Sequence, residues 1–464
     1  MEILDRPLDE LAAAIRSKEI RSVQLVRGYL DRIEKVNDKL NAVVCSNAEI
    51  AMKQAAKADA EQDSGTLHGP LHGIPMTIKD SLDTMDTITT WGTTGRKDFR
   101  PGRDATCVAR LRDAGAILLG KTNTPEFTLW FQTDNLVYGP TKNPFDLSRT
   151  PGGSSGGAAA IIAAGASLFD VGTDTAGSIR LPSHFCGISG IKPTTGRVPC
   201  TGNALPSSGL IATLSQPGPM GRSVADLAYL LPLMSGPDQL DPYAVPAVWH
   251  KPEEVEMESL KIAYHADNGI KTPMVEIMDT VKNVVSLLSE YGLTATEARP
   301  AGVEMASFIL GRVFSADGGD LVEALLEDCR TTTPSPKIQE NLDQGGLEID
   351  QREFAQVITL WDNFRSSMLG FFEDFDVLIC PVNASTAIPL GETEDMLAYT
   401  YTSAYNLAGW PGTVIRAGTD SNGLPIGIQI LARPFREDHC LAVAGWLEAH
   451  LGTFPKPSIH CVND

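Results

Sequence analysis

Two serines flanked by glycines are the residues of this sequence best suited to covalent chemistry. Ser154 lies within the run 151–157, and Ser178 follows Gly177, 24 residues further along the chain. A serine hydroxyl attacks a carbonyl carbon efficiently only when a base accepts its proton. Neighbouring glycines let backbone N–H groups approach a ligand without obstruction by side chains. The run 151–157 continues directly into an apolar small-residue helix, so it predicts a catalytic loop and not a flexible linker.

Lys79 is the lysine best placed to act as that base. An ordinary lysine has a pKa of about 10.4, so it is protonated and cannot accept a proton at neutral pH. Burial favours the neutral amine and lowers this pKa. Lys79 directly follows the mainly apolar run 74–78, which predicts a buried strand. We therefore expect the Lys79 amine to be shielded from water.

A different serine mechanism competes with this one. Residues 152–156 match the G-x-S-x-G nucleophile elbow of α/β-hydrolases, which joins a strand directly to a helix. Residues 149–151 form a poor strand end, because the third of them is a proline. In this alternative His439 would be the base and Asp376 or Asp420 the acid. A Ser-His-Asp esterase therefore remains open at this point.

Two further motif matches have simpler explanations. Residues 115–122 fit the phosphate-loop pattern, but their four variable positions are themselves a predicted strand, and no helix follows Lys121. Ser189 and Lys192 fit an S-x-x-K motif, which needs both residues on one helix. Gly190 and Pro193 make that helix improbable, so we expect neither nucleotide binding nor a nucleophile at Ser189.

Helix and strand patterns alternate along the chain and must position these residues. Helices are predicted at 8–15, 23–33 (with Ser22 as N-cap), 48–63, 106–114, 158–164 and 273–291. Strands are predicted at 74–78, 116–119, 168–171, 260–264, 377–380, 413–416 and 426–431. Such alternation predicts an α/β domain with a mixed sheet between helices. The proline-rich stretch 235–256 is expected to be a surface excursion, followed by helical segments to about residue 345.

Composition narrows the function classes. The 464 residues carry a formal net charge of −20, which disfavours nucleic-acid partners. The eight cysteines contain no C-x-x-C pair and the sequence contains no H-E-x-x-H motif, so we expect no disulfide framework, no metal site and no cofactor. The N-terminus lacks a signal-peptide pattern, and the longest small-apolar stretch, 158–169, is too short to span a bilayer. We expect a cytoplasmic protein without membrane contact.

Seven segments of the sequence resemble the amidase signature family. They are Gly69–Asp80, Gly120–Glu126, Thr150–Gly157, Gly172–Arg180, Gly187–Thr194, Asp376–Pro381 and Gly423–Gln429. The resemblance covers nearly the whole chain. It implies one domain over residues 1–464, with a mixed, mostly parallel sheet flanked by helices on both faces. It also implies hydrolysis of amide-like C–N bonds, in amides, anilides or carbamates, or of esters, through an acyl-enzyme.

The resemblance also implies a role for each site residue. Ser178 matches the nucleophile, Ser154 the bridging serine, which follows a cis peptide bond in this family, and Lys79 the base. The expected oxyanion hole consists of the backbone N–H groups of Thr175, Ala176, Gly177 and Ser178. Asp174 and Arg180 are expected to brace this loop. Alanine at 176 departs from the usual glycine, and its Cβ would disfavour a positive φ there.

The substrate is the least determined feature. The apolar run that includes Leu129, Trp130 and Phe131 matches the acyl-pocket segment of the family, which suggests aryl or alkyl acyl groups on a small-molecule substrate. Buried core packing explains this run nearly as well. The leading hypothesis is a stand-alone amidase, and a homodimer is the oligomeric state considered for it. The alternatives are the glutaminase subunit of a tRNA-dependent amidotransferase and a non-enzymatic binding protein.

Overall fold

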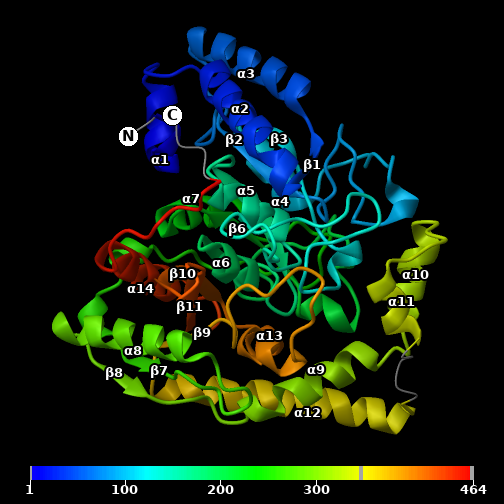
Figure 1. Ribbon diagram of the computed structural model, residues 1–464, viewed down its shortest axis with the longest axis vertical. Coiled ribbons are helices and arrows are strands. Elements are labelled where there is room, and N and C mark those ends of the chain that lie inside the picture. Colours follow the sequence, from blue (N-terminus) through cyan, green and yellow to red (C-terminus); the bar gives the residue numbers. More distant parts are fainter. Residues whose placement is uncertain (1–2, 344–348, 460–464) are drawn as a thin grey trace.

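The computed structural model describes residues 3–343 and 349–459, which contain two β-sheets among helices (Figure 1). The larger sheet has the strand order β4-β6-β5-β10-β11-β9-β7-β8. Its strands are β4 (Phe169–Asp174), β5 (Ser189–Lys192), β6 (Gln216–Gly221), β7 (Ile262–Tyr264), β8 (Ala295–Glu297), β9 (Val377–Pro381), β10 (Gly412–Thr419) and β11 (Pro425–Ala432). The predicted strands at 168–171, 260–264, 377–380, 413–416 and 426–431 all lie in this sheet.

The pairing within the larger sheet corrects one expectation. The sheet is mixed, as predicted, but neighbouring strands are antiparallel from β4 through to β9, and parallel only between β9, β7 and β8. The expectation of mostly parallel pairing is therefore wrong. Strands β10 and β11 are joined by only residues 420–424, and so short a connection permits a hairpin but no parallel crossover.

Helices cover both faces of the larger sheet. Ile428 and Ile430 of β11 pack in one hydrophobic cluster with residues of α7 (Val224–Met234), α8 (Val275–Glu290) and α14 (Glu437–His450). Leu431 of β11 instead packs with residues of α9 (Ala306–Ser315), α12 (Gln351–Gly370) and α13 (Thr400–Leu407). Since successive side chains of a strand point to opposite faces, these two groups of helices lie on opposite sides. The predicted α/β layering is confirmed.

The smaller sheet carries Lys79. Its order is β1 (Val43–Ser46), β3 (Ile117–Thr122), β2 (Pro75–Lys79), with β2 parallel to β3. Helices α1 (Leu8–Arg16), α2 (Ser22–Leu40), α3 (Ala48–Asp63) and α4 (Thr106–Asp113) confirm the predicted helices of this region. Ser22 is the first residue of α2 and not its N-cap, because the Asp59 carboxylate of α3 accepts hydrogen bonds from the Ser22 and Val23 amides.

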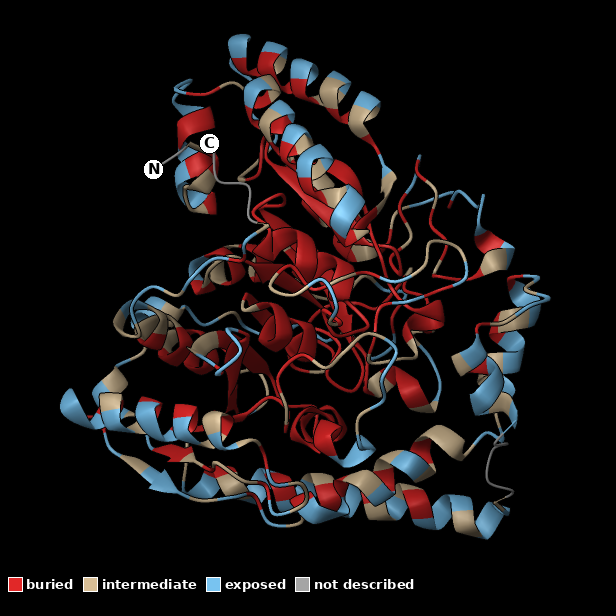
Figure 2. Cartoon of the chain, in the orientation of Figure 1, coloured by how far each residue is buried: buried red, intermediate tan, exposed pale blue. Residues whose placement is uncertain are grey.

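Helices α5 (Gly156–Ala163) and α6 (Arg180–Cys186) lie next to the catalytic motifs and are buried along their whole length. Every residue of both helices is buried, and they belong to the red centre of the molecule in Figure 2. α5 begins two residues after Ser154, and α6 begins two residues after Ser178. Because closely packed interiors resist deformation, these helices hold the two serines on rigid supports.

Both discounted motifs prove to be strands. Residues 117–122 of the phosphate-loop match form β3, and the buried Lys121 amine donates to the Thr84 hydroxyl at 2.7 Å and to the Leu82 carbonyl. Ser189 and Lys192 lie in β5, and Lys192 donates to the Pro193 carbonyl at 2.8 Å. Neither lysine is available to a ligand in the way that its motif requires.

The proline-rich stretch 235–256 and the helical segments after it also follow the predictions. Residues 235–256 contain no helix or strand apart from a short 3-10 turn at Pro252–Glu254, and Leu240 and Val248 are exposed there. Helices α9, α10 (Asp320–Asp328) and α11 (Pro336–Asp343) confirm the helical segments, whose expected end near 345 lies outside the described residues. Within residues 3–343 and 349–459, none of the helices has both the length and the apolarity needed to cross a bilayer.

Candidate active site

Lys79 lies at the end of β2 with its side chain fully buried. Its amine nitrogen is 2.7 Å from the Ser154 hydroxyl and 2.8 Å from the Thr173 hydroxyl. The Thr173 carbonyl oxygen lies 3.5 Å from the same nitrogen. The sequence predicted a buried Lys79, and the structure confirms it with an exposed fraction of 0%. The hydrogen-bond partners of this amine among the described residues are thus neutral oxygens.

Burial controls the protonation of this amine. Desolvation lowers the pKa of Lys79 well below its usual range, and the charges of Asp174 and Asp170 oppose this effect only partly. Asp170, on β4, is itself fully buried and accepts hydrogen bonds from the hydroxyls of Thr77 and Thr122. Burial raises the pKa of Asp170 to about 6 despite these bonds. This environment favours the uncharged form of the Lys79 amine.

Glycines allow the Ser154 loop to pack directly against other backbone. The peptide bond Gly153–Ser154 is cis, in agreement with the family resemblance. A Cβ on Gly153 would lie 2.8 Å from the backbone of Phe131 and Gln132. The Thr133 hydroxyl donates to the Gly152 carbonyl at 2.9 Å and accepts from the Gly156 amide at 3.0 Å. The loop is therefore fixed against the segment that was predicted to bind substrate.

Ser178 lies on the turn between β4 and α6. Its carbonyl oxygen accepts a hydrogen bond of 3.1 Å from the Ser155 amide, which joins the two serine segments. Ser178 is 6% exposed and borders a cavity, whereas Ser154 is completely buried. Gly177 has φ of +129°, and a Cβ there would collide with Thr402. Glycine is required at this position for both reasons.

A buried ion pair holds the Ser178 turn in shape. The Asp174 carboxylate accepts from the Arg180 side chain at 3.0 Å and from Asn406 at 2.9 Å. It also accepts from the backbone amides of Gly177 at 2.8 Å and Ile179 at 3.2 Å. Burial alone would raise the pKa of Asp174, but the Arg180 charge and these hydrogen bonds hold it well below its usual range. The Asp174 carboxylate thus connects residues 177, 179 and 180 of this turn.

These contacts refine the expected oxyanion hole. The Gly177 amide donates to Asp174, so it is not free to donate to a substrate oxygen, and its inclusion in the hole is corrected. Among the described residues, the Thr175, Ala176 and Ser178 amides have no such partner. Ala176 does not have a positive φ, so its Cβ causes no backbone strain. Its carbonyl oxygen accepts a hydrogen bond of 2.8 Å from the Thr402 hydroxyl.

A cavity of about 340 Å³ opens beside Ser178. Leu129, Trp130 and Phe131 line it together with Thr175 and Ala176. The opposite wall comes from helices α9, α10 and α11 and from the 3-10 turn at Met396–Tyr399, through Leu310, Phe314, Val322, Leu342 and Met396. Phe131 stacks on Tyr399 with ring centroids 3.8 Å apart, and Lys337 lies 4.0 Å from the centre of the Trp130 ring. Of the described residues that line this cavity, none is charged.

Several residues of the site were missed by the sequence analysis. Thr173 contacts Lys79, Asn406 and Gln429 contact Arg180, and Thr402 contacts Ala176. Thr173 lies within the 172–180 segment of the family resemblance, and this position is the signal that could have marked it. Asn406, Gln429 and Thr402 are more than 200 residues from their partners in the sequence, and no local pattern links them.

The Ser-His-Asp alternative finds no support in this geometry. His439 lies on α14 and borders a separate cavity with Arg436 and Asp438. The Asp376 carboxylate accepts from the Lys261 amide, and the Asp420 carboxylate accepts from the Thr386 hydroxyl. The described hydrogen-bond partner of the Ser154 hydroxyl is the Lys79 amine.

Comparison with known proteins agrees with this arrangement. The Amidase family model matches residues 24–441. This chain belongs to the amidase signature family. It is an amide-hydrolysing enzyme with a mixed α/β fold, as the sequence predicted.

Three relatives show how the family divides. The chain is 32% identical to a glutamyl-tRNA(Gln) amidotransferase subunit from Heliobacterium modesticaldum, over 98% of this chain and 99% of the relative. It is 31% identical to an acylamidase of Rhodococcus erythropolis, over 95% and 94% of the two chains. A solved structure of 6-aminohexanoate cyclic dimer hydrolase superposes with a TM-score of 0.89 at 27% identity, covering 99% of this chain and 100% of the other. Identity alone therefore does not separate the two kinds of relative.

Proposed function

We propose that this amidase works alone on small neutral amides and anilides with an apolar or aromatic acyl group. Ser178 is the nucleophile, Ser154 relays its proton, and Lys79 is the base. The observation that carries this proposal is the buried Lys79 amine, 2.7 Å from the Ser154 hydroxyl and shielded from water. A lysine in this position accepts a proton near neutral pH, whereas an exposed one does not.

The contacts of Lys79 are consistent with a neutral amine. Such an amine has two N–H donors and one lone pair. The two oxygen atoms of Thr173, at 2.8 and 3.5 Å, can accept the two N–H groups. The lone pair then receives the hydrogen bond of the Ser154 hydroxyl. An ammonium group would lack this lone pair and could not accept a proton from Ser154.

We infer the reaction from the contact between Lys79 and Ser154 and from the hydrogen bond that joins the segment of Ser154 to that of Ser178. The Ser178 oxygen attacks the carbonyl carbon, its proton passes to Ser154, and the Ser154 proton passes to Lys79. The amides of Thr175, Ala176 and Ser178 donate to the developing oxyanion. The proton then returns through Ser154 to the leaving nitrogen, and the C–N bond breaks to leave an acyl-enzyme. A water molecule then attacks the acyl carbonyl carbon, and its proton passes through Ser154 to Lys79. The bond to the Ser178 oxygen breaks, the proton returns to that oxygen, and the carboxylic acid is released.

The lining of the cavity supports an apolar acyl group. Leu129, Trp130 and Phe131 form one wall, and the described lining carries no charged side chain. Glutamine as a substrate would bring an ammonium and a carboxylate group into this space, and burying them unpaired is costly. This disfavours the glutaminase alternative, although relatives of that kind are as similar as the acylamidase. Esters and carbamates present the same carbonyl group and are expected to react as well.

A substrate panel tests the proposal. The purified chain, without any partner, should release nitroaniline from the 4-nitroanilide of an aromatic acid, and Ser178→Ala should lose this activity. Its kcat/KM for the aromatic anilide should exceed that for 4-nitroacetanilide. Ammonia release from glutamine should remain at background. If glutamine is hydrolysed and the anilides are not, the glutaminase alternative is correct.

A further inference from the structure

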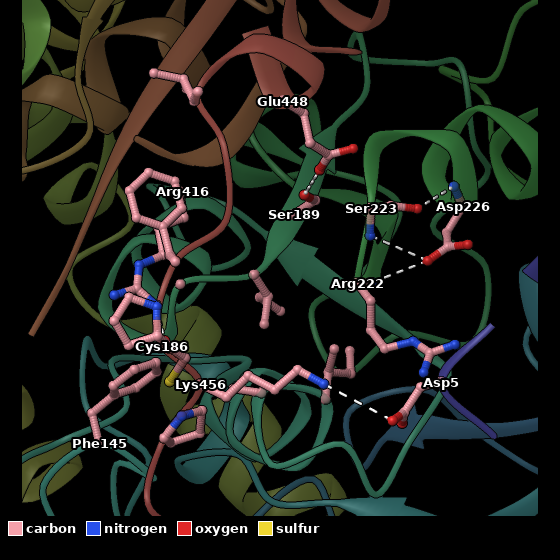
Figure 3. A pocket seen from close by; sticks show the side chains of 18 of the residues that line it. Asp5, Phe145, Cys186, Ser189, Arg222, Ser223, Asp226, Arg416, Glu448 and Lys456 are labelled. Carbon is pink, nitrogen blue, oxygen red and sulfur yellow. Dashed lines mark hydrogen bonds and ion pairs between the residues drawn. The ribbon is translucent and has the colours of Figure 1, made fainter. Parts of the chain in front are cut away.

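A second cavity, of about 380 Å³, lies at the far ends of the two helices that follow the catalytic serines (Figure 3). Ile162 and Ala163 end α5, and Cys186 ends α6; all three line this cavity. Glu448 of α14, residues 451–452 and residues 454–457 also line it. The cavity shares no lining residue with the one that borders Ser178. It is therefore a separate space that reaches the same two buried helices.

Arg416 lines this cavity and has no carboxylate partner among the described residues. Its guanidinium donates to the carbonyl oxygens of Pro455 at 2.7 Å and Gly418 at 3.3 Å, and to the Thr419 hydroxyl at 2.8 Å. None of these partners is anionic, and a guanidinium has five N–H donors. Burial lowers the pKa of Arg416 to about 10. A partly buried cation with spare donors favours an anion as its partner.

The carboxylates around the cavity are committed to other groups. Asp5 accepts from Arg32 at 2.8 Å, and its distance to Lys456 is 4.0 Å. Asp226 accepts backbone amides, including that of Leu8. Glu448 accepts from the Ser189 hydroxyl and the Val224 amide. Lys456 is therefore paired with Asp5, whereas the guanidinium groups of Arg222 and Arg416 donate to carbonyl and hydroxyl oxygens.

Two aromatic rings also lie close to the Arg416 guanidinium. The rings of Phe145 and Phe454 each have their centres 5.0 Å from it. Ile162, Ile188 and Leu451 line the same cavity. A ligand that suits this space combines one negative group with an apolar body. In Figure 3 Arg416 and Phe145 lie together on one side, and Lys456 extends across the middle.

We infer that this cavity binds a small carboxylate with an apolar or aromatic body, whose carboxylate group pairs with Arg416 and whose body packs between Phe145 and Phe454. The acid that the proposed reaction releases belongs to this class, so under the proposed function the cavity is a second site for the product. The inference itself rests on the cavity and its charges, and it holds whichever residue is the nucleophile.

Calorimetric titration with phenylacetate tests the inference on the full chain. Treatment with phenylmethanesulfonyl fluoride first blocks Ser178, so that binding beside it does not contribute. The treated chain should bind one phenylacetate at low ionic strength, and neutral phenylacetamide much more weakly. Arg416→Gln should weaken phenylacetate binding roughly tenfold to a hundredfold, the range for a charged hydrogen-bonded pair. Arg433→Gln, a matched change at an exposed arginine, should leave it unchanged.

Two results would overturn the inference: no phenylacetate binding to the treated chain, or equal binding to Arg416→Gln and its parent. If Arg416→Gln does not fold, Phe454→Ala replaces it, because residue 454 lies outside the helices and strands. The same weakening is expected there. If the reagent leaves Ser178 unmodified, the proposed nucleophile fails. The titration of the Arg416 and Arg433 variants, fitted with a second site, still decides the separate question of this cavity.

Discussion

Replacing Arg180 by methionine should destabilise the fold by about 3 kcal/mol. Arg180 and Asp174 are both completely buried, and their charged atoms are 3.0 Å apart. Removal of one partner from a buried ion pair typically costs about 3–5 kcal/mol, because the other charge is left without compensation. Asp174 keeps hydrogen bonds from Asn406 and from the Gly177 and Ile179 amides in the variant, so we expect the lower end of this range.

Urea unfolding, followed by tryptophan fluorescence at pH 7, measures this change. The double variant Asp174→Asn/Arg180→Met should be less destabilised than the sum of the two single variants, since it leaves no charge unpaired. Arg433→Met, at an exposed position, should stay within about 0.5 kcal/mol of the parent. An Arg180→Met variant as stable as Arg433→Met would refute the conclusion that this ion pair braces the Ser178 turn.

Three further predictions concern the base, the cavity and a buried carboxylate. Lys79→Ala should lower kcat for an anilide by about 10²–10⁴-fold, the usual contribution of a general base, whereas His439→Ala should stay near the parent; the reverse pattern would reject the lysine mechanism. Phe131→Ala, which loses the stacking on Tyr399, should lower kcat/KM for an aromatic anilide several-fold more than for 4-nitroacetanilide, and equal losses would contradict its role in the cavity. Asp170→Asn should gain stability relative to the parent as pH rises from about 4 to 6. The folded pKa of Asp170, about 6, lies above its ordinary 3.8, so between these pH values the folded parent binds more protons than the unfolded chain. The free energy of unfolding of the parent therefore falls by on the order of 3 kcal/mol as pH rises through this window. A stability difference that does not change with pH in urea unfolding would contradict this prediction.

The local features of the site could be predicted from the sequence. The apolar run before Lys79 predicted its burial, and the glycines around Ser154 and Ser178 marked tight backbone approach. Asp174 and Arg180 are six residues apart on one turn, so their pairing was also within local reach. Each of these inferences depends on residues close in sequence, where spacing constrains geometry.

Long-range features could not be predicted in this way. Arg180 contacts Gln429 of β11 and Asn406 of α13, and Ala176 contacts Thr402 of α13. These contacts form only when α13 and β11 pack against α6 and the turn before it. The mostly parallel pairing was expected from the family resemblance alone, because strand patterns in a single sequence do not encode which strands become neighbours. The same limit applies to the cavity wall from α9, α10 and α11, whose apolar residues resemble any amphipathic helix face.

The protonation state of Lys79 is the most direct test of the proposed mechanism. Nitrogen-15 labelling of lysine, with Lys79→Met to assign the signal, allows the amine of Lys79 to be titrated by NMR. If Lys79 is the base, its amine is uncharged at pH 7, and its burial predicts a pKa well below the ordinary lysine value of about 10.4. A Lys79 amine that stays protonated at pH 7 and titrates near the ordinary lysine value of about 10.4 would contradict the proposed role of Lys79 as the base.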